Sequence, residues 1–184
     1  MVFRRLGFLC LFFTCCRPSF SQNLVKDEAS KKYAYKSNKF QYTEFSNFVN
    51  GFAFVNKGKK YAFVNTHGDT LCPFEYNLVQ SFNEIGLSLV GKDSLWGLID
   101  SLNQVLLPFQ YQEAYFETPN CVSLFNGQYW QIAEISSQGI EFSGIYKKKP
   151  FVKNGLLHTY FERQGIWQIQ DLASFFSSVH HNKP

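Results

Sequence analysis

The sequence repeats itself every 34 or 35 residues, and this period constrains the fold more than any other feature. One tyrosine recurs with spacings of 34, 35 and 35 residues, and an aromatic column and a glycine column keep the same phase. The columns are Tyr42, Tyr76, Tyr111 and Tyr146; Tyr61, Trp96, Trp130 and Trp167; and Gly51, Gly86, Cys121 and Gly155. Such a period is typical of arrays in which each unit buries its apolar face on the next. We predict about four copies within residues 40–171, the last truncated after Asp171.

The second copy shows the unit most clearly. Residues 86–90 alternate between apolar and polar side chains, and residues 95–100 and 105–108 form two further short apolar runs. Turn residues separate the three runs, and Asn103 suits a left-handed backbone position. Pro108 lacks a backbone donor, so it should end the third strand or lie on an edge. The pattern predicts a three-stranded antiparallel meander, followed by a linker that carries Phe-x-Tyr.

The repeat predicts an all-β fold. Tetratricopeptide helices have a similar period, but they need longer runs at 3.6-residue spacing. A single three-stranded unit cannot bury its apolar face, so stacked copies should share a core, with the Trp96 column at each junction. Four unequal copies favour an open, solenoid-like stack, although spacing alone leaves a closed, propeller-like ring as the alternative.

Residues 40–171 resemble the bacterial WG-repeat family, which repeats Lys-Trp-Gly-x-Ile-Asp followed by Gly and Ile-Pro. The motifs that carry the resemblance are Phe48–Val55 in copy 1 and Leu95-Trp96-Gly97-Leu98-Ile99-Asp100 with Leu106-Leu107-Pro108 in copy 2. Copies 3 and 4 depart from the family pattern, with Trp130-Gln131 and Trp167-Gln168 in place of Trp-Gly. The resemblance implies an all-β repeat array without catalytic residues.

The two ends of the chain differ from the repeats. Residues 1–21 combine a positive start, an 11-residue apolar run and small residues at Ser19 and Ser21, which is the layout of a signal peptide. We therefore expect an exported bacterial protein, periplasmic, outer-surface or secreted, with no transmembrane span in the mature chain. Residues 22–39 form a polar segment that we expect to be loosely ordered. In residues 172–184 we expect a short capping helix on the open end, followed by a tail.

Composition and charge exclude some classes of function. The chain carries 34 aromatic residues among 184, which is incompatible with a largely disordered protein. Three arginines lie in the signal segment, and the remainder has 15 basic against 14 acidic residues. A chain so close to neutral lacks the basic footprint of a nucleic-acid-binding protein.

No motif indicates an enzyme, a metal or a cofactor. A polar row, Asn65, Asp100, Glu134 and Asp171, follows the aromatic column by four residues. Carboxylates spaced so sparsely suit turn caps better than calcium ligands. His67 lies in a turn of copy 1 alone. Cys72 and Cys121 are expected to be small buried apolar residues, with a disulfide as the alternative.

The remaining function is recognition. We predict a binding module for a protein or glycan partner, with a self-associating structural component of the cell envelope as the alternative. The repeating tyrosines are expected to pack between copies. A binding surface should use aromatic residues that the repeat does not require. These candidates are Tyr33, Tyr35, Tyr115, Phe125, Tyr129 and Tyr160.

Overall fold

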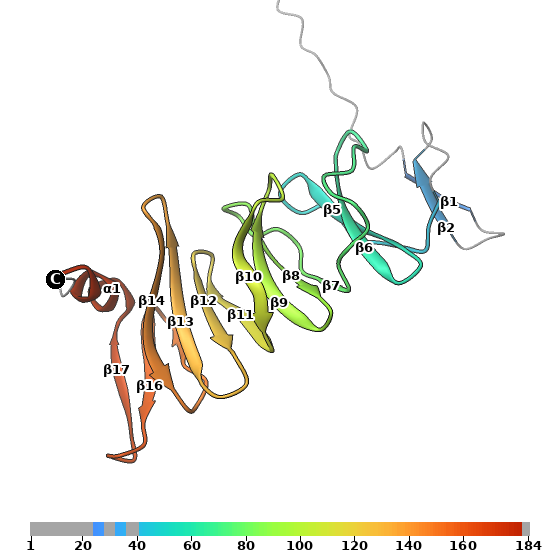
Figure 1. The fold of residues 1–184 in the computed structure, drawn as a ribbon. Coiled ribbons are helices and arrows are strands. Elements are labelled where there is room, and N and C mark those ends of the chain that lie inside the picture. The colour runs from blue at the N-terminus through green and yellow to red at the C-terminus, as the bar shows by residue number, and fades with distance from the viewer. Residues whose placement is uncertain (1–23, 28–31, 36–40, 182–184) are drawn as a thin grey trace, which may run out of the picture.

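The chain folds into a row of small antiparallel sheets that follow one another in sequence order (Figure 1). The structure is a computed structural model that describes residues 24–27, 32–35 and 41–181. It contains five sheets of three or four strands, none of which closes on itself, so the all-β open array is confirmed. The predicted signal segment lies outside the described residues.

Each predicted copy corresponds to one sheet. Copy 1 comprises β4 (Glu44–Phe45), β5 (Phe52–Lys57) and β6 (Lys60–Asn65). Copy 2 comprises β7 (Leu78–Val79), β8 (Leu87–Lys92), β9 (Leu95–Asp100) and β10 (Val105–Tyr111). Copy 3 comprises β11 (Glu113–Thr118), β12 (Cys121–Phe125), β13 (Trp130–Ser136) and β14 (Gly139–Tyr146). Copy 4 comprises β15 (Phe151–Lys153), β16 (Leu156–Phe161) and β17 (Ile166–Asp171).

The turns of copy 2 match the prediction, and its third strand is longer than expected. Asp93, Ser94 and Asn103 have positive φ values of 50°, 68° and 62°, which turn the chain between strands. Strand β10 continues through Pro108 to Tyr111, so Phe-x-Tyr belongs to a strand here and not to a linker. Pro108 is tolerated because β10 is an outer strand of its sheet, and the register to β9 shifts beside it.

The polar N-terminal segment is more ordered than predicted. Strands β1 (Leu24–Asp27) and β2 (Lys32–Tyr35) pair as a hairpin, and β3 (Gln41–Tyr42) joins β2. In this fifth sheet Tyr33 pairs with Tyr42, much as Trp96 pairs with Tyr111 in copy 2. The sheet is therefore a shortened further unit. The alternation of Lys32-Tyr33-Ala34-Tyr35 is the strand signal that the polar composition obscured.

The repeating tyrosines, and not the tryptophans, form the core of the junctions. All four tyrosines of the column are buried, as expected. The Tyr76 ring packs with Phe63 and Phe109, and its hydroxyl donates to Asn103 Oδ1 at 2.6 Å. The expectation that the Trp column supplies buried area at every junction is wrong, because Trp96 is only half-buried and Trp167 is exposed. The tryptophans lie on the side that faces the following copy, and the described residues contain no copy after copy 4.

The departure from Trp-Gly in copy 3 goes together with a change on its third strand. A side chain at Gly97 would meet the Leu107 carbonyl oxygen at 2.7 Å and the Phe109 ring at 3.0 Å. In copy 3 glutamine replaces this glycine at position 131, and the Phe109 position is occupied by Gly144. A side chain at Gly144 would collide with the Tyr146 ring. Copy 2 thus combines glycine on the second strand with phenylalanine on the third, copy 1 combines Ala62 with Phe74, and copy 3 combines Gln131 with Gly144.

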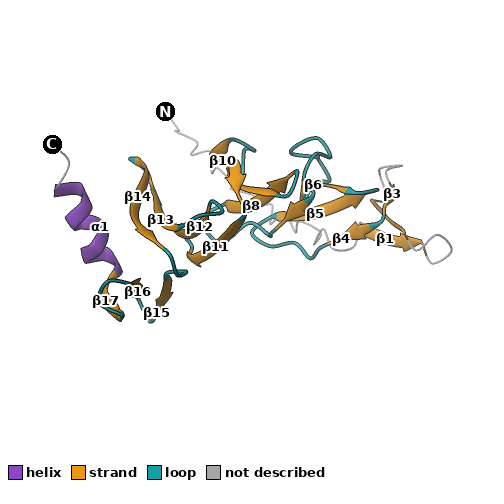
Figure 2. Ribbon diagram, turned by 60° about the horizontal axis from the view of Figure 1, so that its bottom comes forward, coloured by secondary structure: helices purple, strands orange, loops and turns teal. Residues whose placement is uncertain are grey.

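The predicted capping helix exists, but it does not close the open end. Helix α1 (Leu172–His181) begins directly after β17, and Asp171 Oδ1 accepts a hydrogen bond from the Ser174 amide at 2.8 Å. Phe176 is buried with Cys121, Ile132 and Leu157, so the helix packs over the junction of copies 3 and 4 (Figure 2). At 10 residues α1 is too short to cross a bilayer, and no described helix has the length and apolarity to do so.

The two cysteines of the described chain are buried free thiols in different core clusters, as the favoured interpretation predicted. Burial raises the pKa of the Cys121 thiol to about 12, with smaller contributions from the Glu117 and Glu134 carboxylates. At pH 8 we expect the native Cys121 to react with a maleimide about a thousandfold more slowly than in guanidinium, because little thiolate forms. Peptide mapping by mass spectrometry measures both rates. Equal rates would place the thiol at the surface.

Candidate binding face

The last sheet presents an aromatic face to solvent, which we call the terminal face. Strands β15, β16 and β17 pair so that Phe151 lies opposite His158, His158 opposite Ile169, and Tyr160 opposite Trp167. Side chains alternate along a strand, so these cross-strand partners project to the same side of the sheet. The terminal face consists of Phe151, Leu156, His158, Tyr160, Trp167 and Ile169.

The rings of the terminal face touch one another. Phe151 stacks on His158 with centroids 4.6 Å apart and planes 8° from parallel, and it meets Trp167 edge-on at 5.6 Å. The ring centroids of Trp167 and Tyr160 also lie 5.3 Å apart. Contacts of this kind stabilise aromatic pairs beyond the area that they bury. They hold the face as a continuous platform.

A cation borders the platform. Lys148 Nζ lies 3.5 Å from the centroid of the Tyr160 ring, within the range of a cation–π contact. Beside Tyr160, a hollow of about 250 Å³ lies between the end of β14 and the β16–β17 hairpin. Ile145, Phe161 and Arg163 line it, and an exposed Lys147–Glu162 ion pair of 3.1 Å borders it. The edge of the face is thus polar and its centre apolar, as in protein-binding surfaces.

The inner copies bury the surface that copy 4 exposes. The residues equivalent to Ile169 are Phe63, Leu98 and Ile132, which are 1%, 0% and 0% exposed, whereas Ile169 is 57% exposed. Trp130 is 8% exposed and its equivalent Trp167 is 44% exposed. In copies 1 to 3 the following copy covers this surface. Within the described residues nothing covers it in copy 4.

Strand β17 also lacks the neighbour that its equivalents have. Strands β9 and β13 each pair with a third strand, β10 and β14, whereas β17 pairs only with β16 in the described part of the chain. Helix α1 follows where the third strand would begin. The terminal face therefore adjoins an open strand edge, which offers backbone groups as well as side chains.

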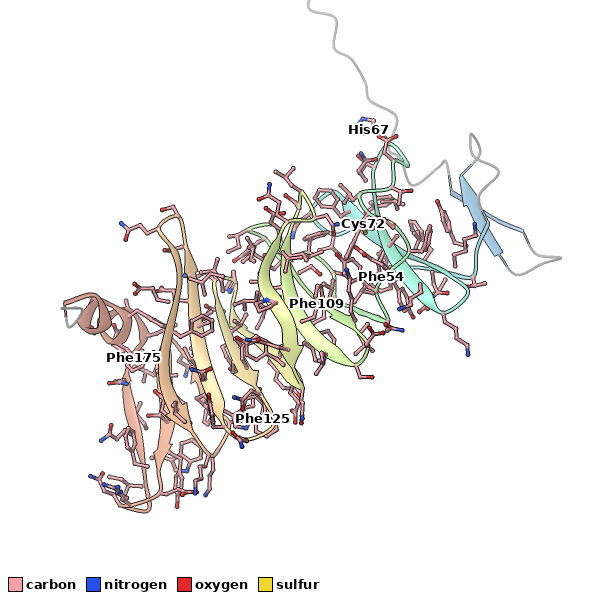
Figure 3. The ribbon with its side chains drawn as sticks, in the orientation of Figure 1. Phe54, His67, Cys72, Phe109, Phe125 and Phe175 are labelled. Atoms are coloured by element: carbon pink, nitrogen blue, oxygen red, sulfur yellow. The ribbon has the colours of Figure 1, made fainter. Side chains whose placement is uncertain are left out.

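Two of the predicted surface residues lie at the junction between copies 3 and 4, where Tyr115 is exposed and Phe125 is half-buried. Tyr115 and Phe125 both stack on Trp130, with centroid distances of 6.1 and 5.0 Å. Lys149 of the following copy lies 3.8 Å from the centroid of the Tyr115 ring. This is the copy 3 counterpart of the terminal face, and Figure 3 shows Phe125 within the sheet row. This junction shows which contacts a following copy makes with such a surface.

Glu117 fixes the same junction. Its side chain is 8% exposed and accepts hydrogen bonds from Ser123 Oγ at 2.6 Å and from the Val152 amide at 3.1 Å. It also pairs with Lys149 at 3.2 Å. Three donors compensate the burial of this carboxylate. Copy 4 is thereby attached firmly to copy 3.

The other predicted surface residues are dispersed. Tyr160 lies on the terminal face, whereas Tyr129 is half-buried in a turn. In that turn Asn126 Oδ1 accepts a hydrogen bond from the Tyr129 amide at 3.1 Å. Tyr33 and Tyr35 lie in β2 at the opposite end of the array, and their side chains are outside the description. The six predicted residues thus do not form one site.

Two residues of the polar row, Asn65 and Asp100, cap turns as predicted, whereas Asp171 caps helix α1 and Glu134 accepts a hydrogen bond from the Asn120 side chain. Asn65 Oδ1 accepts the amides of His67 and Asp69, both at 2.9 Å. Asp100 Oδ1 accepts the amides of Leu102 and Gln104 at 2.9 and 2.8 Å. His67 extends from the tip of its turn, away from the sheets (Figure 3). Among the described residues no three His, Cys, Asp or Glu side chains group as metal ligands.

Sequence reasoning missed Phe151, His158, Trp167 and Ile169 as site residues. Trp167 was assigned to the junction core because it shares a column with Trp96. The signal that distinguishes it is the truncation after Asp171, because a last copy has no following copy to cover its outer face.

The described residues match a known repeat family. Residues 39–61, 61–96 and 96–118 each match the family described as "WG containing repeat". A comparison with curated proteins finds no match.

Solved structures resemble the array only weakly. One is "KlHsv2 with loop 6CD replaced by a Gly-Ser linker", with 13% identity, a TM-score of 0.40, and coverage of 66% of this chain and 45% of that chain. Another is Hsv2p of Kluyveromyces lactis, with 12% identity, a TM-score of 0.37, and coverage of 70% and 45%. The chain spans less than half of their length, and similarity at this level carries no argument about function.

Proposed function

Because residues 39–118 consist of WG-containing repeats, and copies 3 and 4 continue their arrangement, we propose that this chain is a non-enzymatic binding module. Its binding surface is the terminal face. We further propose that the chain is exported, on the basis of the signal-like residues 1–21.

One observation carries the proposal. Ile169 is 57% exposed, whereas its three equivalents are buried beneath the following copy. Aromatic and aliphatic side chains that form one exposed patch mark interaction sites more often than scattered surface residues do. The inner copies show that this surface can pack closely against protein.

The chemistry of the face favours a protein partner over a glycan. Leu156 and Ile169 flank the rings, and the unpaired edge of β17 adjoins them. The charged groups that could meet a sugar's hydroxyls lie at the border of the face, whereas a polypeptide can use both the apolar centre and the backbone edge. The equivalent ring Tyr115 is contacted by Lys149, a protein side chain.

Binding to the face is tested with the double variant Tyr160→Ala/Trp167→Ala. We expect it to lose at least about tenfold in affinity for a partner from the native cells, because the central rings are gone. Its thermal unfolding should shift less than loss of a fully buried ring would cause, since Trp167 is 44% exposed and Tyr160 is half-buried. The matched control is Phe142→Ala on β14, a ring that is 42% exposed on another sheet.

The partner class decides between the alternatives. The proposal is supported if the chain captures a partner, protease treatment of the extract abolishes this capture, and the double variant but not the control variant loses it. Capture that survives protease but not glycosidase would identify a glycan and overturn it. Recovery of the chain itself as the sole partner would indicate a self-associating structural component.

A further inference from the structure

We propose that β17 is an acceptor edge, which binds an extended segment of a second polypeptide as the missing third strand of copy 4. The inference rests on the proposed function and specifies how the partner binds. It also specifies the sequence of that segment. Strands β10 and β14 lie beside their second strands, and residues 70–76 make isolated bridges to β6 in the same place in copy 1.

The backbone of copy 1 shows which groups of β17 are available. The Tyr61 amide donates to the Tyr76 carbonyl at 2.7 Å, and the Tyr76 amide donates back at 3.3 Å. The Phe63 carbonyl accepts from the Leu71 amide at 2.8 Å. Trp167 and Ile169 occupy the positions of Tyr61 and Phe63, so their backbone groups face the open edge. Addition of a strand would satisfy them.

The edge has none of the usual protection against pairing. The six residues of β17, Ile-Trp-Gln-Ile-Gln-Asp, include no proline and no lysine. Five of them are apolar, aromatic or carry a neutral amide, and the one charged residue, Asp171, ends the strand. Exposed strands that must remain unpaired typically carry proline, lysine or a bulge. Strand β10, by contrast, carries Pro108. The composition of β17 is therefore typical of an inner strand, which pairs with a strand on each side.

The register predicts a tyrosine opposite Trp167. Tyr61 pairs with Tyr76, Trp96 with Tyr111, and Trp130 with Tyr146. All three third strands thus place a tyrosine against the aromatic column. The bound segment should do the same.

Gln168 predicts a glycine two residues before that tyrosine. Glycine at position 97 accompanies Phe109 on the third strand, whereas Gln131 accompanies Gly144. Gln168 corresponds to Gln131, so the segment should resemble Ser-Gly-Ile-Tyr of β14 and not Pro-Phe-Gln-Tyr of β10. The chain's own third strands are already paired, so the donor is a different polypeptide.

Two peptides test this specificity on the full chain. One copies residues 139–147 of β14 and the other copies residues 104–112 of β10. By fluorescence anisotropy we expect the β14 peptide to bind saturably and at least about tenfold more tightly than the β10 peptide. The variant Gln168→Gly should reverse this preference. Equal affinity of both peptides for both acceptors, or no binding of either, would overturn the inference.

A backbone control separates edge pairing from contact with the face. N-methylation of the peptide tyrosine removes the amide that would donate to the Trp167 carbonyl, and it leaves the acceptor unchanged. We expect at least about a tenfold loss of affinity. If the native partner needs Tyr160 and Trp167 while N-methylation has no effect, the proposed function stands and the acceptor edge is wrong. If the chain forms concentration-dependent dimers and Gln168→Gly abolishes them, a second copy of this chain occupies the edge. This result would also overturn the inference.

Discussion

Replacement of Tyr76 by alanine is expected to lower the free energy of unfolding by about 4 kcal/mol. The Tyr76 ring is fully buried between copies 1 and 2, and it packs against Phe63 and Phe109. Loss of the ring leaves a cavity at the junction, and Asn103 loses the hydroxyl that donates to its Oδ1. Urea unfolding followed by circular dichroism measures the change.

Trp96→Ala is the matched comparison. Trp96 is half-buried, so we expect a smaller loss of about 1–3 kcal/mol. Tyr76→Phe keeps the ring, and it should cost about 1 kcal/mol because it removes only the hydrogen bond to Asn103. A larger loss for Trp96→Ala than for Tyr76→Ala would show that the tryptophan column, and not the tyrosine column, holds the copies together.

The second large effect concerns the glycine of the Trp-Gly pair. Gly97→Gln is expected to destabilise the array by about 3 kcal/mol, because its side chain meets the Leu107 carbonyl and the Phe109 ring. In the double variant Gly97→Gln/Phe109→Gly, which reproduces the Gln131 and Gly144 pair of copy 3, the collision with the ring is removed. We expect the loss of stability in the double variant to be smaller than the sum of the two single losses by at least about 1 kcal/mol.

A double-mutant cycle in urea measures this coupling. Gly97→Ala is the control for the Cβ alone, which already meets the Leu107 carbonyl and the Phe109 ring, so it separates that contact from the effect of the longer glutamine side chain. Strict additivity of Gly97→Gln and Phe109→Gly would contradict the complementary packing. It would also remove the argument that Gln168 selects a glycine in the bound segment.

The repeat period predicted most of the fold because each copy forms one sheet from local sequence. The strand Leu95–Asp100 and the left-handed Asn103 follow directly from alternation and turn chemistry. Burial was harder to predict, because a repeat column does not show which copy covers which side chain. Tyr76 and Trp96 both recur as aromatics, yet only Tyr76 lies within the core.

The binding face could be predicted only in part. The search for aromatics outside the repeat identified Tyr160 but also Tyr115 and Phe125, which form the copy 3 counterpart of the face at the junction with copy 4, where Tyr115 stays 42% exposed. Trp167 and Ile169 belong to the repeat pattern, and they are exposed because no described residue packs on this side of copy 4 as a following copy does in the inner copies. Whether a repeat residue is core or surface thus depends on its neighbour and not on its own identity.

Hydroxyl-radical footprinting of the tryptophans tests the central claim most directly. It compares the purified chain at low concentration with the same chain in a non-denaturing extract of its native cells. We predict that Trp167 is oxidised several-fold faster than Trp130 in the purified chain, and that the extract protects Trp167 while Trp96 is unchanged. Protection of Trp167 in the purified chain, or no protection in the extract, would contradict the account of the terminal face as a binding surface.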